Sequence, residues 1–492
     1  MRPPCVAGVL AAVLAAVVMA PGPAFAQDPA PAAGYAPPIF GAPPAEPAPP
    51  SLAAVRLFPE KPEPCPGCPK RRPWHAVGQV LGINVLYNLV NLAIKPADEK
   101  IYFKTYPKIW WNNISYGFEW DDNTFQVNQF GHPYQGNNYF TAGRANGLSF
   151  WESAPLAALG SLTWEYLGER HKPSLNDLVM TTMGGISLGE MFHRTAWLIR
   201  DPRQTGKPRL TREIIAAVFD PITGLNRFIS GDSGKVTEKP AEYIPTRLLA
   251  AFDAGVLWQG EDLSFTSASG DPFLQVNLGY GTLAEGRSKK PFDAFLVDLR
   301  FGGGAGISEA QVRGRLFGRP LGEAPDKEAD PSRYMSVVMG YDYHDNTAYQ
   351  FGGQSIASVL SAVRTLSPAW KLALTIHGGA LVLGAMDSLY YDGPDRQYDF
   401  GPGFSYGGGV VLTRKGLPFA RASYGGLWMH TVDGAQADHW AQGLRFDLII
   451  PVKGKVGVGS TAEFIRRKSY YDAADDVMQR FPQLRVYLSW TK

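Results

Sequence analysis

The sequence predicts an α+β protein, with an N-terminal helical domain followed by a transmembrane antiparallel β-barrel of about 12 strands. Three observations predict this class: an export signal at the start, helical spacing of apolar residues over 74–230, and a period of two from 245 to 492. Charged residues make up only 19% of the chain and aromatic residues 12%, which favours a sheet-rich protein over an average cytosolic enzyme. The net charge of +2 leaves no concentrated basic face, so nucleic acid is excluded as a partner.

Residues 1–26 have the layout of a secretory signal peptide. Arg2 precedes an apolar run that ends at Ala20, and Ala24 and Ala26 flank Phe25 as in an A-x-A cleavage site. Export by this signal, together with the barrel, predicts the outer membrane of a Gram-negative cell as the location and outer-membrane lipid as a partner.

Residues 27–73 are dominated by Pro and Ala and predict an extended linker. Cys65 and Cys68 stand in this linker as Cys-Pro-Gly-Cys. In an oxidising compartment this spacing favours a small local disulfide, because a redox site would need a helix at the first Cys and a zinc site would need two more ligands.

Apolar residues at helical spacing predict helices over 75–94, 154–167 and 177–192 within the helical domain 74–230. None has 18 uninterrupted apolar residues, so we interpret them as buried helices and not as membrane spans. Pro173 and Ser174 predict capping of the third helix. One face of the first helix carries three amides at i, i+4 and i+7, which we expect to face a polar network in the lumen: Asn84, Asn88 and Asn91.

Alternating segments predict the barrel over 245–492. They lie at 248–259, 274–280, 295–301, 307–320, 335–343, 353–365, 370–377, 398–414, 418–432, 444–450, 455–470 and 484–490. Turn residues such as Asp345-Asn346 and Asp433-Gly434 separate several of them. A charge on the lipid face costs about 2–4 kcal/mol at mid-membrane, and the apolar sets contain none, which favours a barrel over a periplasmic β-sandwich.

The opposite face of these segments is polar and is expected to line the lumen. Its charges are mixed in sign, so the sequence predicts no ion preference: Asp253, Asp298, Arg300, Lys371, Arg421, Arg445, Asp447, Glu463 and Arg485. His377 is expected to line the lumen beside Thr375.

The segment 110–194 is the densest in unusual polar residues and holds the candidate site. Our hypothesis is that four side chains converge as general acid/base groups or metal ligands: His132, Glu165, Glu169 and Asp177. Glu165 and Glu169, at i and i+4, share a helical face and repel each other unless a cation, a proton or donors compensate them. Four further residues are candidates for binding: Arg144, Asn146, Ser174 and Asn176.

The alternative is a satisfied hydrogen-bond network that fixes a helical plug against the barrel wall. His132-Pro133 is also typical of a turn, and Glu190 and Arg194 are spaced for a salt bridge. The sequence has no phosphate loop, dinucleotide fingerprint, Gly-x-Ser-x-Gly elbow or His-Glu-x-x-His motif, and we assign no cofactor and no metal site from spacing.

Three blocks in this segment resemble a family of uncharacterised bacterial envelope proteins known only as a domain of unknown function. The blocks correspond here to Asn128, Phe130, His132, Pro133, Tyr134 and Gly136; to Arg144, Asn146 and Gly147; and to Trp164, Glu165, Tyr166, Gly168, Glu169, Pro173, Ser174, Asn176 and Asp177. The chain departs from the pattern at Gly143, where Ala is expected before Arg. The resemblance covers roughly 110–200 and implies no activity.

A weaker similarity is to VanZ-like families, on Glu165, Asp177, Gly185 and Gly189, with Glu169 in place of a usual Gln. It indicates helix packing, since the two glycines allow another helix to approach closely. Two functions follow as expectations. The first is an outer-membrane barrel with a helical plug or cap domain that handles a small molecule or lipid or supports envelope architecture. The second is an enzyme on lipid or cell-wall material with its site in the helical domain. The sequence leaves the choice, and the oligomeric state, open.

Overall fold

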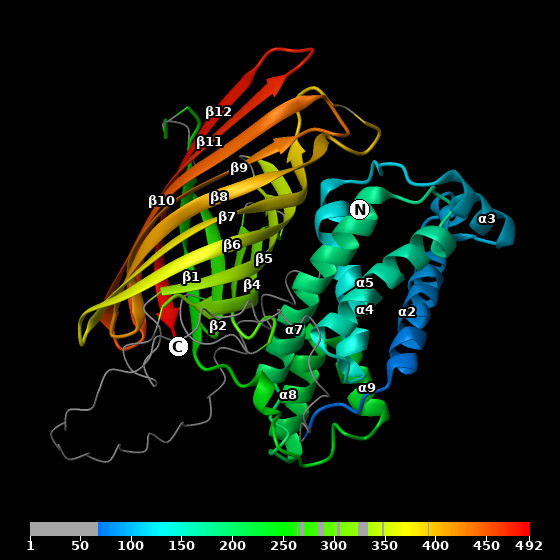
Figure 1. Cartoon of the computed structure of the whole chain (residues 1–492), viewed down its shortest axis with the longest axis horizontal. Helices are drawn as coiled ribbons and strands as arrows, with labels where there is room; N and C mark the ends of the chain where they lie inside the picture. Colours follow the sequence, from blue (N-terminus) through cyan, green and yellow to red (C-terminus); the bar gives the residue numbers. More distant parts are fainter. Residues whose placement is uncertain are drawn as a thin grey trace, which may run out of the picture.

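The computed structural model describes residues 67–262, 264–265, 270–283, 290–302, 306–322, 333–346, 349–391 and 393–492. The predicted signal peptide and most of the predicted linker, including Cys65, lie outside these residues. Cys68 is disulfide-bonded. Figure 1 shows two bodies side by side, a barrel in green to red and a helical domain in blue to green.

The barrel is closed and antiparallel, and each strand pairs with its neighbours in the sequence, with β1 closing on β12. The 12 strands are β1 (Leu248–Gln259), β2 (Gly270–Tyr280), β3 (Phe295–Gly302), β4 (Ile307–Pro320), β5 (Arg333–Asp345), β6 (Gln350–Ser367), β7 (Trp370–Asp387), β8 (Tyr398–Arg414), β9 (Leu417–His430), β10 (Ala437–Lys453), β11 (Val456–Tyr471) and β12 (Val477–Thr491). The predicted strand number and every predicted strand position are confirmed. The structure extends most of the strands, because the alternation fades near the loops while the backbone pairing continues.

The inner face of the barrel is polar, as predicted. Arg485 pairs with Glu463 at 2.7 Å, and Arg467 of β11 reaches Asp387 of β7 at 2.5 Å. β7 and β11 are four strands apart in the sheet, so their side chains can meet only across the lumen. The face that carries Arg467 and Asp387 is therefore the inner face of the barrel.

The outer face is apolar and is exposed on part of the barrel only. Leu444 of β10 lies opposite Tyr424 and Phe464 on its neighbours, and all three side chains are exposed. Around the ring, one outward residue in each of β2, β3 and β4 that continues the row of Trp490 and Phe252 is buried: Val276, Leu299 and Ala310. Something other than solvent therefore covers the outer wall from β2 to β4.

The cover is the helical domain. Its elements are α2 (Pro73–Ile94), η1 (Glu99–Phe103), α3 (Pro107–Tyr116), η2 (Val127–Gly131), α4 (His132–Ala145), α5 (Phe150–Thr163), η3 (Trp164–Gly168), α6 (Leu175–Val179), η4 (Met180–Gly184), α7 (Gly185–Ile199), α8 (Gly206–Phe219), α9 (Pro221–Ile229) and η5 (Ala241–Tyr243). α6, η4 and α7 follow one another without a break, and η2, η3 and η4 are π-helical turns.

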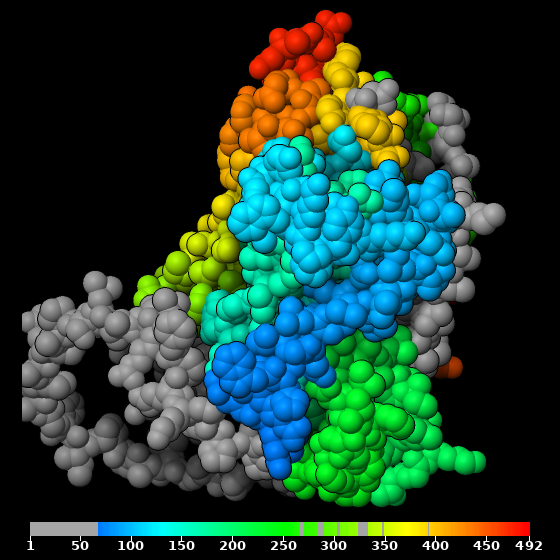
Figure 2. Space-filling model, turned by 90° about the vertical axis from the view of Figure 1, so that its right-hand side faces the viewer, coloured from blue at the N-terminus to red at the C-terminus, as the bar shows by residue number. Residues whose placement is uncertain are grey.

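Contacts between the two bodies join helices to the outer wall. Tyr341 of β5, which lies opposite the outward Val312, donates from its hydroxyl to the carbonyl oxygen of Gln129 at 2.8 Å. The ring of Phe125 lies 5.6 Å from that of Tyr343, two residues along the same face. Burying one such aromatic side chain stabilises the contact by about 1.5–3 kcal/mol. Figure 2 shows the helices in front of the barrel wall.

This arrangement corrects the expected placement of the domain. A plug would contact the charged inner face, whereas these helices contact the apolar outer face. The amides of α2 do not face the lumen either: Asn84 donates to the carbonyl oxygen of Gly160 at 2.9 Å, and Asn88 to that of Gly168 at 2.7 Å. The reason is that α2 packs on α4 and α5, on the side of the domain away from the barrel.

Close backbone contact joins α4 to the η4–α7 segment. A Cβ on Gly136 would overlap the carbonyl oxygen of Thr181, and a Cβ on Gly185 would overlap the backbone of Gly136. A Cβ on Gly189 would lie 2.7 Å from Cδ1 of Phe140. Gly185 and Gly189 thus admit another helix, in agreement with the prediction.

Two local predictions need correction. His132-Pro133 opens α4 and is not a turn, because proline is well tolerated in the first turn of a helix. Ser174 does occupy the N-cap position of α6, but its side chain makes no capping hydrogen bond.

Candidate functional site

Three side chains form a compact group beside the outer wall. Asp121 comes from the loop after α3, His132 from the start of α4 and Asp177 from α6, and their ligand atoms all lie within 4.8 Å of one another. Nε2 of His132 is 3.5 Å from Oδ2 of Asp177. His132 and Asp177 are buried, while Asp121 is half-buried.

Amides hold the carboxylates of this group in place. Asn176 donates to Oδ1 of Asp177 at 2.8 Å, and its own side-chain oxygen accepts from the backbone N–H of Asp121 at 2.9 Å. Asn128, with its amide nitrogen turned toward the carboxylates, donates to Asp177 and to Asp121 at 3.2 Å each and accepts from the hydroxyl of Tyr398 at 2.8 Å. Tyr398 is the first residue of β8, so the group lies beside a loop end of the barrel wall.

The loop that carries Asp121 is tied to the helices by backbone bonds. Glu119 forms an isolated parallel bridge with Ser174, in which its N–H donates to Pro173 at 2.8 Å and its carbonyl oxygen accepts from Leu175 at 2.9 Å. This bridge fixes the distance between Asp121 and α6. It also places Ser174 at the site through its backbone.

Glu165 and Glu169 lie next to this group, although not as predicted. They were expected on one face of an α-helix, but Glu165 lies in the π-helical turn η3 and Glu169 is the extended residue after it. Oε2 of Glu165 accepts from the N–H of Ser174 at 2.8 Å, whereas its buried Oε1 has no hydrogen-bond partner. Glu165 is only 1% exposed, so water does not reach this oxygen and the described residues give it no partner.

Burial favours the protonated form of the acids and the neutral form of the histidine. Burial raises the pKa of Glu165 and that of Asp177 well above their usual values, with the charges of neighbouring carboxylates adding to the effect. Burial, and next the charge of Asp121, raises the pKa of Glu169 to about 8. Burial lowers the pKa of His132 to about 4. At neutral pH, His132 therefore presents a neutral imidazole, and Glu169 keeps a proton that it would give up to a bound cation.

The other two predicted binding residues lie elsewhere. Arg144 pairs through Nε with Glu190 at 2.9 Å, and Arg194 pairs with the same carboxylate at 2.8 Å, which confirms the predicted Glu190–Arg194 salt bridge. Asn146 is the C-cap of α4 and donates to Gln79 and to the carbonyl oxygen of Ala142. Both belong to the packing of the helical domain.

Asp121 was missed by the sequence reasoning. It stands in Trp120-Asp121-Asp122-Asn123, between predicted elements, and nothing in its spacing relates it to residue 177. Asp122 points elsewhere, since its carboxylate pairs with Arg396 at 3.1 Å. Two adjacent carboxylates in this loop could have indicated a site, but the sequence did not show which helix the loop contacts.

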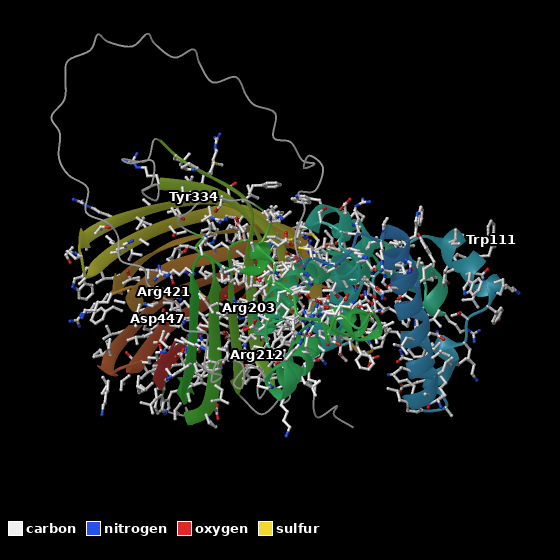
Figure 3. All side chains as sticks on the ribbon, turned by 90° about the horizontal axis from the view of Figure 1, so that it is seen from below. Trp111, Arg203, Arg212, Tyr334, Arg421 and Asp447 are labelled. Carbon is white, nitrogen blue, oxygen red and sulfur yellow. The ribbon has the colours of Figure 1, made fainter. Side chains whose placement is uncertain are left out.

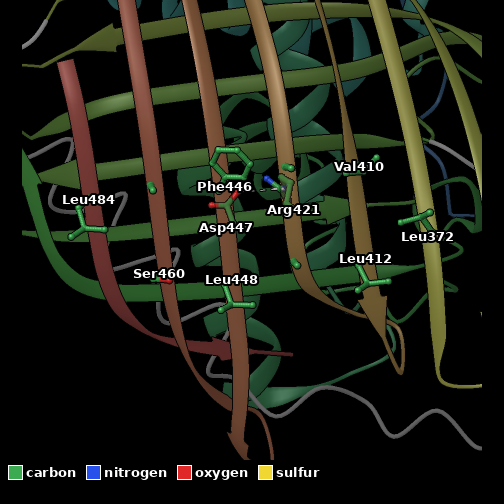
Figure 4. Close-up of a pocket in the computed structure, with 12 residues that line it drawn as sticks. Leu372, Val410, Leu412, Arg421, Phe446, Asp447, Leu448, Ser460 and Leu484 are labelled. Carbon is green, nitrogen blue, oxygen red and sulfur yellow. Dashed lines mark ion pairs between the residues drawn. The ribbon is translucent and has the colours of Figure 1, made fainter. Parts of the chain in front are cut away.

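The outer wall also carries an apolar groove of about 380 Å³ between β7 and β12, shown in Figure 4. Small residues, Ala420, Ala422 and Ala462, lie between larger ones such as Phe446 and Leu448. The Arg421–Asp447 pair borders the groove from the lumen side of the same strands, with Nε and Oδ2 4.0 Å apart. The groove suits an apolar chain and offers no acid/base chemistry comparable with the group around Asp177.

Fold and site together define a class: a closed 12-stranded β-barrel with a helical domain on its outer wall and a buried acid–imidazole group in that domain. The chain matches, over residues 117–222, the model of a domain of unknown function, DUF3943. This range contains Asp121, His132, Glu165, Glu169 and Asp177. No curated protein matches the chain.

Solved structures similar to the chain include outer-membrane porins. The NanC porin has a TM-score of 0.26 and 9% identity, and the match covers 48% of this chain and 98% of that one. The KdgM porin has a TM-score of 0.23 and 7% identity, covering 49% and 98%, and an anion-selective porin from Comamonas acidovorans has 0.22 and 9%, covering 50% and 99%. The barrel described above rests on the strand pairing of this chain itself.

Proposed function

We propose that the protein is an outer-membrane protein that handles lipid on the outside of its barrel, through a divalent cation held by Asp121, His132 and Asp177. The observation that carries the proposal is the position of this group. It lies in a domain packed on the outer wall of the barrel, and not in the lumen where a permeating solute would pass.

The surface of the barrel supports a membrane location. The outward residues of β10 from Leu444 to Ile450 and of β12 from Leu484 to Trp490 are all apolar, while outward charges such as Lys468 come near strand ends. β6, β7, β8 and β10 have 17 or 18 residues each, more than the roughly 9–11 needed to cross a bilayer at a tilt. These apolar outward residues form a belt around the barrel, and a soluble barrel would not maintain an exposed apolar belt.

The connections at the Lys492 end of the barrel differ in length. The turns between β6 and β7, β8 and β9, and β10 and β11 have two residues each, while the connections between β2 and β3 and between β4 and β5 have 14 and 12. Tyr398 begins its strand at the opposite end, so the acid–imidazole group lies near the rim of the barrel away from Lys492.

The donor set fits a divalent transition metal. Two carboxylates and an imidazole suit Mn²⁺, Fe²⁺ or Zn²⁺, and Glu165 and Glu169 supply further carboxylate oxygens nearby. Oε1 of Glu165 has no hydrogen-bond partner among the described residues, so it would be free to coordinate a cation once the carboxyl loses its proton. A bound cation would supply charge for an anionic headgroup, while Asn128 and Asn176 orient the carboxylates.

An enzyme that acts on lipid or cell-wall material is the second candidate, and the raised pKa of Glu169 favours it. A carboxyl with a pKa of about 8 holds its proton near neutral pH, as a general acid must. The same residues would serve both functions, so a measurement of chemical change in the bound lipid distinguishes them.

Metal binding by the purified full chain in detergent micelles tests the proposal. We expect one Mn²⁺ per folded chain by calorimetry, and binding at least about 10-fold weaker in His132→Ala and Asp177→Asn, because each removes one of three ligands. Asp122→Asn is the matched control and keeps wild-type affinity, since Asp122 faces Arg396. Folded wild-type protein that binds no stoichiometric Mn²⁺ or Zn²⁺ would refute the metal site.

The lipid step is tested on the same variants. Lipid that co-purifies with the wild-type chain should be reduced in Asp177→Asn and unchanged in Asp122→Asn, as measured by mass spectrometry. Equal lipid in all three proteins would contradict lipid handling, and a chemically altered lipid that requires Glu169 would favour the enzyme.

A further inference from the structure

The surface helix α2 shows an inverted arrangement of polar and apolar residues. The buried side chains that face the domain are small or amide, Ala76, Val80 and Asn84, with Ile83 and Tyr87 packed beside them. The side chains that face away are large and apolar: Leu81, Val85, Leu86, Leu89, Val90 and Ile94 are 41–74% exposed. A helix in contact with water presents the opposite pattern.

The inward amides donate hydrogen bonds within the protein. Asn84 also donates to Oγ1 of Thr163 at 2.8 Å, and Asn88 donates to the carbonyl oxygens of Phe103 and Gly168 at 2.9 and 2.7 Å. Asn91 donates to the carbonyl oxygen of Tyr87 at 2.9 Å. The bonds of Asn84 and Asn88 join α2 to other segments of the domain, as amides do where no water competes for them, whereas the bond of Asn91 lies within α2.

The length and composition of α2 fit a bilayer. Its 22 residues span about 33 Å, close to the roughly 30 Å of the hydrocarbon core. The helix has no Asp, Glu, Lys or Arg, and only 11% of its most apolar window is buried. It is the one helix of the described residues that is long and apolar enough to cross a membrane. The prediction that this segment forms a buried helix is therefore wrong, because its large apolar side chains are exposed.

Both ends of α2 carry residues typical of a membrane interface. Lys70, Arg71 and Arg72 precede it, and Trp74 near its start is 83% exposed. Beyond its end come Lys95, Lys100 and Lys104, together with exposed aromatic residues. Trp111 of α3 is 70% exposed and lies at the end of the domain away from the barrel (Figure 3). Cationic and aromatic side chains in these positions anchor a membrane helix.

We propose that α2 lies within the lipid bilayer beside the barrel, with its apolar face against acyl chains and its amide face against the helical domain. Continuity with the barrel supports this. The helical domain covers the outer wall over β2 to β5 and the adjoining ends of β6, β7 and β8. The rest of the outer wall exposes apolar side chains. The domain therefore takes the place of lipid on the part that it covers, and its far face, α2, is the next surface that lipid meets.

This inference rests on the membrane location in the proposed function, and the test separates the two. Spin labels are placed at Leu86→Cys and Leu89→Cys, one at a time, on a background of Cys65→Ser and Cys68→Ser. The full chain is reconstituted in vesicles of phosphatidylcholine and phosphatidylglycerol. Leu448→Cys on the exposed outer wall serves as the lipid reference and Lys235→Cys, a 63% exposed side chain, as the water reference.

The expected result is that the α2 labels are as accessible to oxygen as the label at 448, and several-fold less accessible to a soluble nickel chelate than the label at 235. Nickel access at α2 equal to that at 235 overturns the inference, because α2 then faces water. Labels that neither reagent reaches also overturn it, since protein, such as a second copy of the chain, then covers α2. If the label at 448 itself is open to nickel, the barrel is not in the bilayer and the proposed function fails as well.

Discussion

Glu169→Gln should remove a pH dependence from the stability of the helical domain. The pKa of Glu169 is raised from 4.5 to about 8 in the folded protein, by burial first and by the charge of Asp121 second. Below pH 4.5 the carboxyl is protonated in both the folded and the unfolded chain. As the pH rises from 4.5 to 8, the unfolded chain releases this proton and the folded chain does not, so stability falls over that window and then levels off.

The size of the effect follows from the pKa difference. Each pKa unit corresponds to about 1.36 kcal/mol, so the metal-free protein loses on the order of 5 kcal/mol between pH 4.5 and 8 through this group. Gln is neutral at every pH and has nearly the same shape. The variant should therefore equal the wild type near pH 4.5 and exceed it in stability near pH 8.

Guanidinium unfolding of the full chain in micelles with a metal chelator, followed by far-UV circular dichroism, measures this difference at both pH values. Glu99→Gln is the control, because Glu99 is an exposed partner of Lys95 and should leave the pH profile unchanged. Parallel pH profiles for the wild type and Glu169→Gln would refute the reasoning. Saturating Mn²⁺ should cancel the loss at pH 8 in the wild type, since a cation favours the ionised carboxylates.

Three further predictions concern packing and placement. Gly136→Ala should destabilise the helical domain by about 1–3 kcal/mol in thermal melts, because the new methyl group meets the backbone at Thr181, whereas Gly82→Ala on α2, with open space around it, should not destabilise it. Arg194→Met should cost about 3–5 kcal/mol in chemical unfolding, since Glu190 loses one of its two buried partners, while Lys95→Met in an exposed pair should change little; equal effects would argue against a buried network. Val486→Arg on the outer wall of β12 should cost about 2–4 kcal/mol in barrel unfolding from micelles and Met478→Arg near the strand end about 0–1 kcal/mol, and a larger cost at 478 would contradict the position of the belt.

The barrel could be predicted from the sequence because its physical cause is local. A strand with one apolar and one polar face shows its period within about ten residues, so the alternation from Leu444 to Ile450 or from Leu484 to Trp490 identifies both the strand and its outward side. The pairing of neighbours in sequence order then needs no long-range information. Strand ends were less well predicted, since bulges such as that between Gln354 and Ser355 interrupt the alternation.

The placement of the helices could not be predicted in this way. Helices against the outer wall and helices in the lumen have the same spacing of apolar residues. They differ in the face of β5 that they contact, which carries Tyr341 on the outside and Asp342 on the inside. The site was predicted in part: His132, Glu165, Glu169 and Asp177 do lie close together. Asp121 completes the group through the bridge between Glu119 and Ser174, a contact 55 residues apart that leaves no local pattern.

The central claim, that the helical domain and its site lie on the outer wall of the barrel, is tested most directly by cross-linking to one face of β6. Gly352 faces outward, where a Cβ would meet the side chain of Gln129, and the next residue, Gly353, faces the lumen, where a Cβ would meet Phe351 and Leu381. In the full chain assembled in the membrane, with Cys65 and Cys68 replaced by Ser, Gln129→Cys should form a disulfide with Gly352→Cys and none with Gly353→Cys. A disulfide with 353 and none with 352 would place the helices inside the barrel and contradict the account.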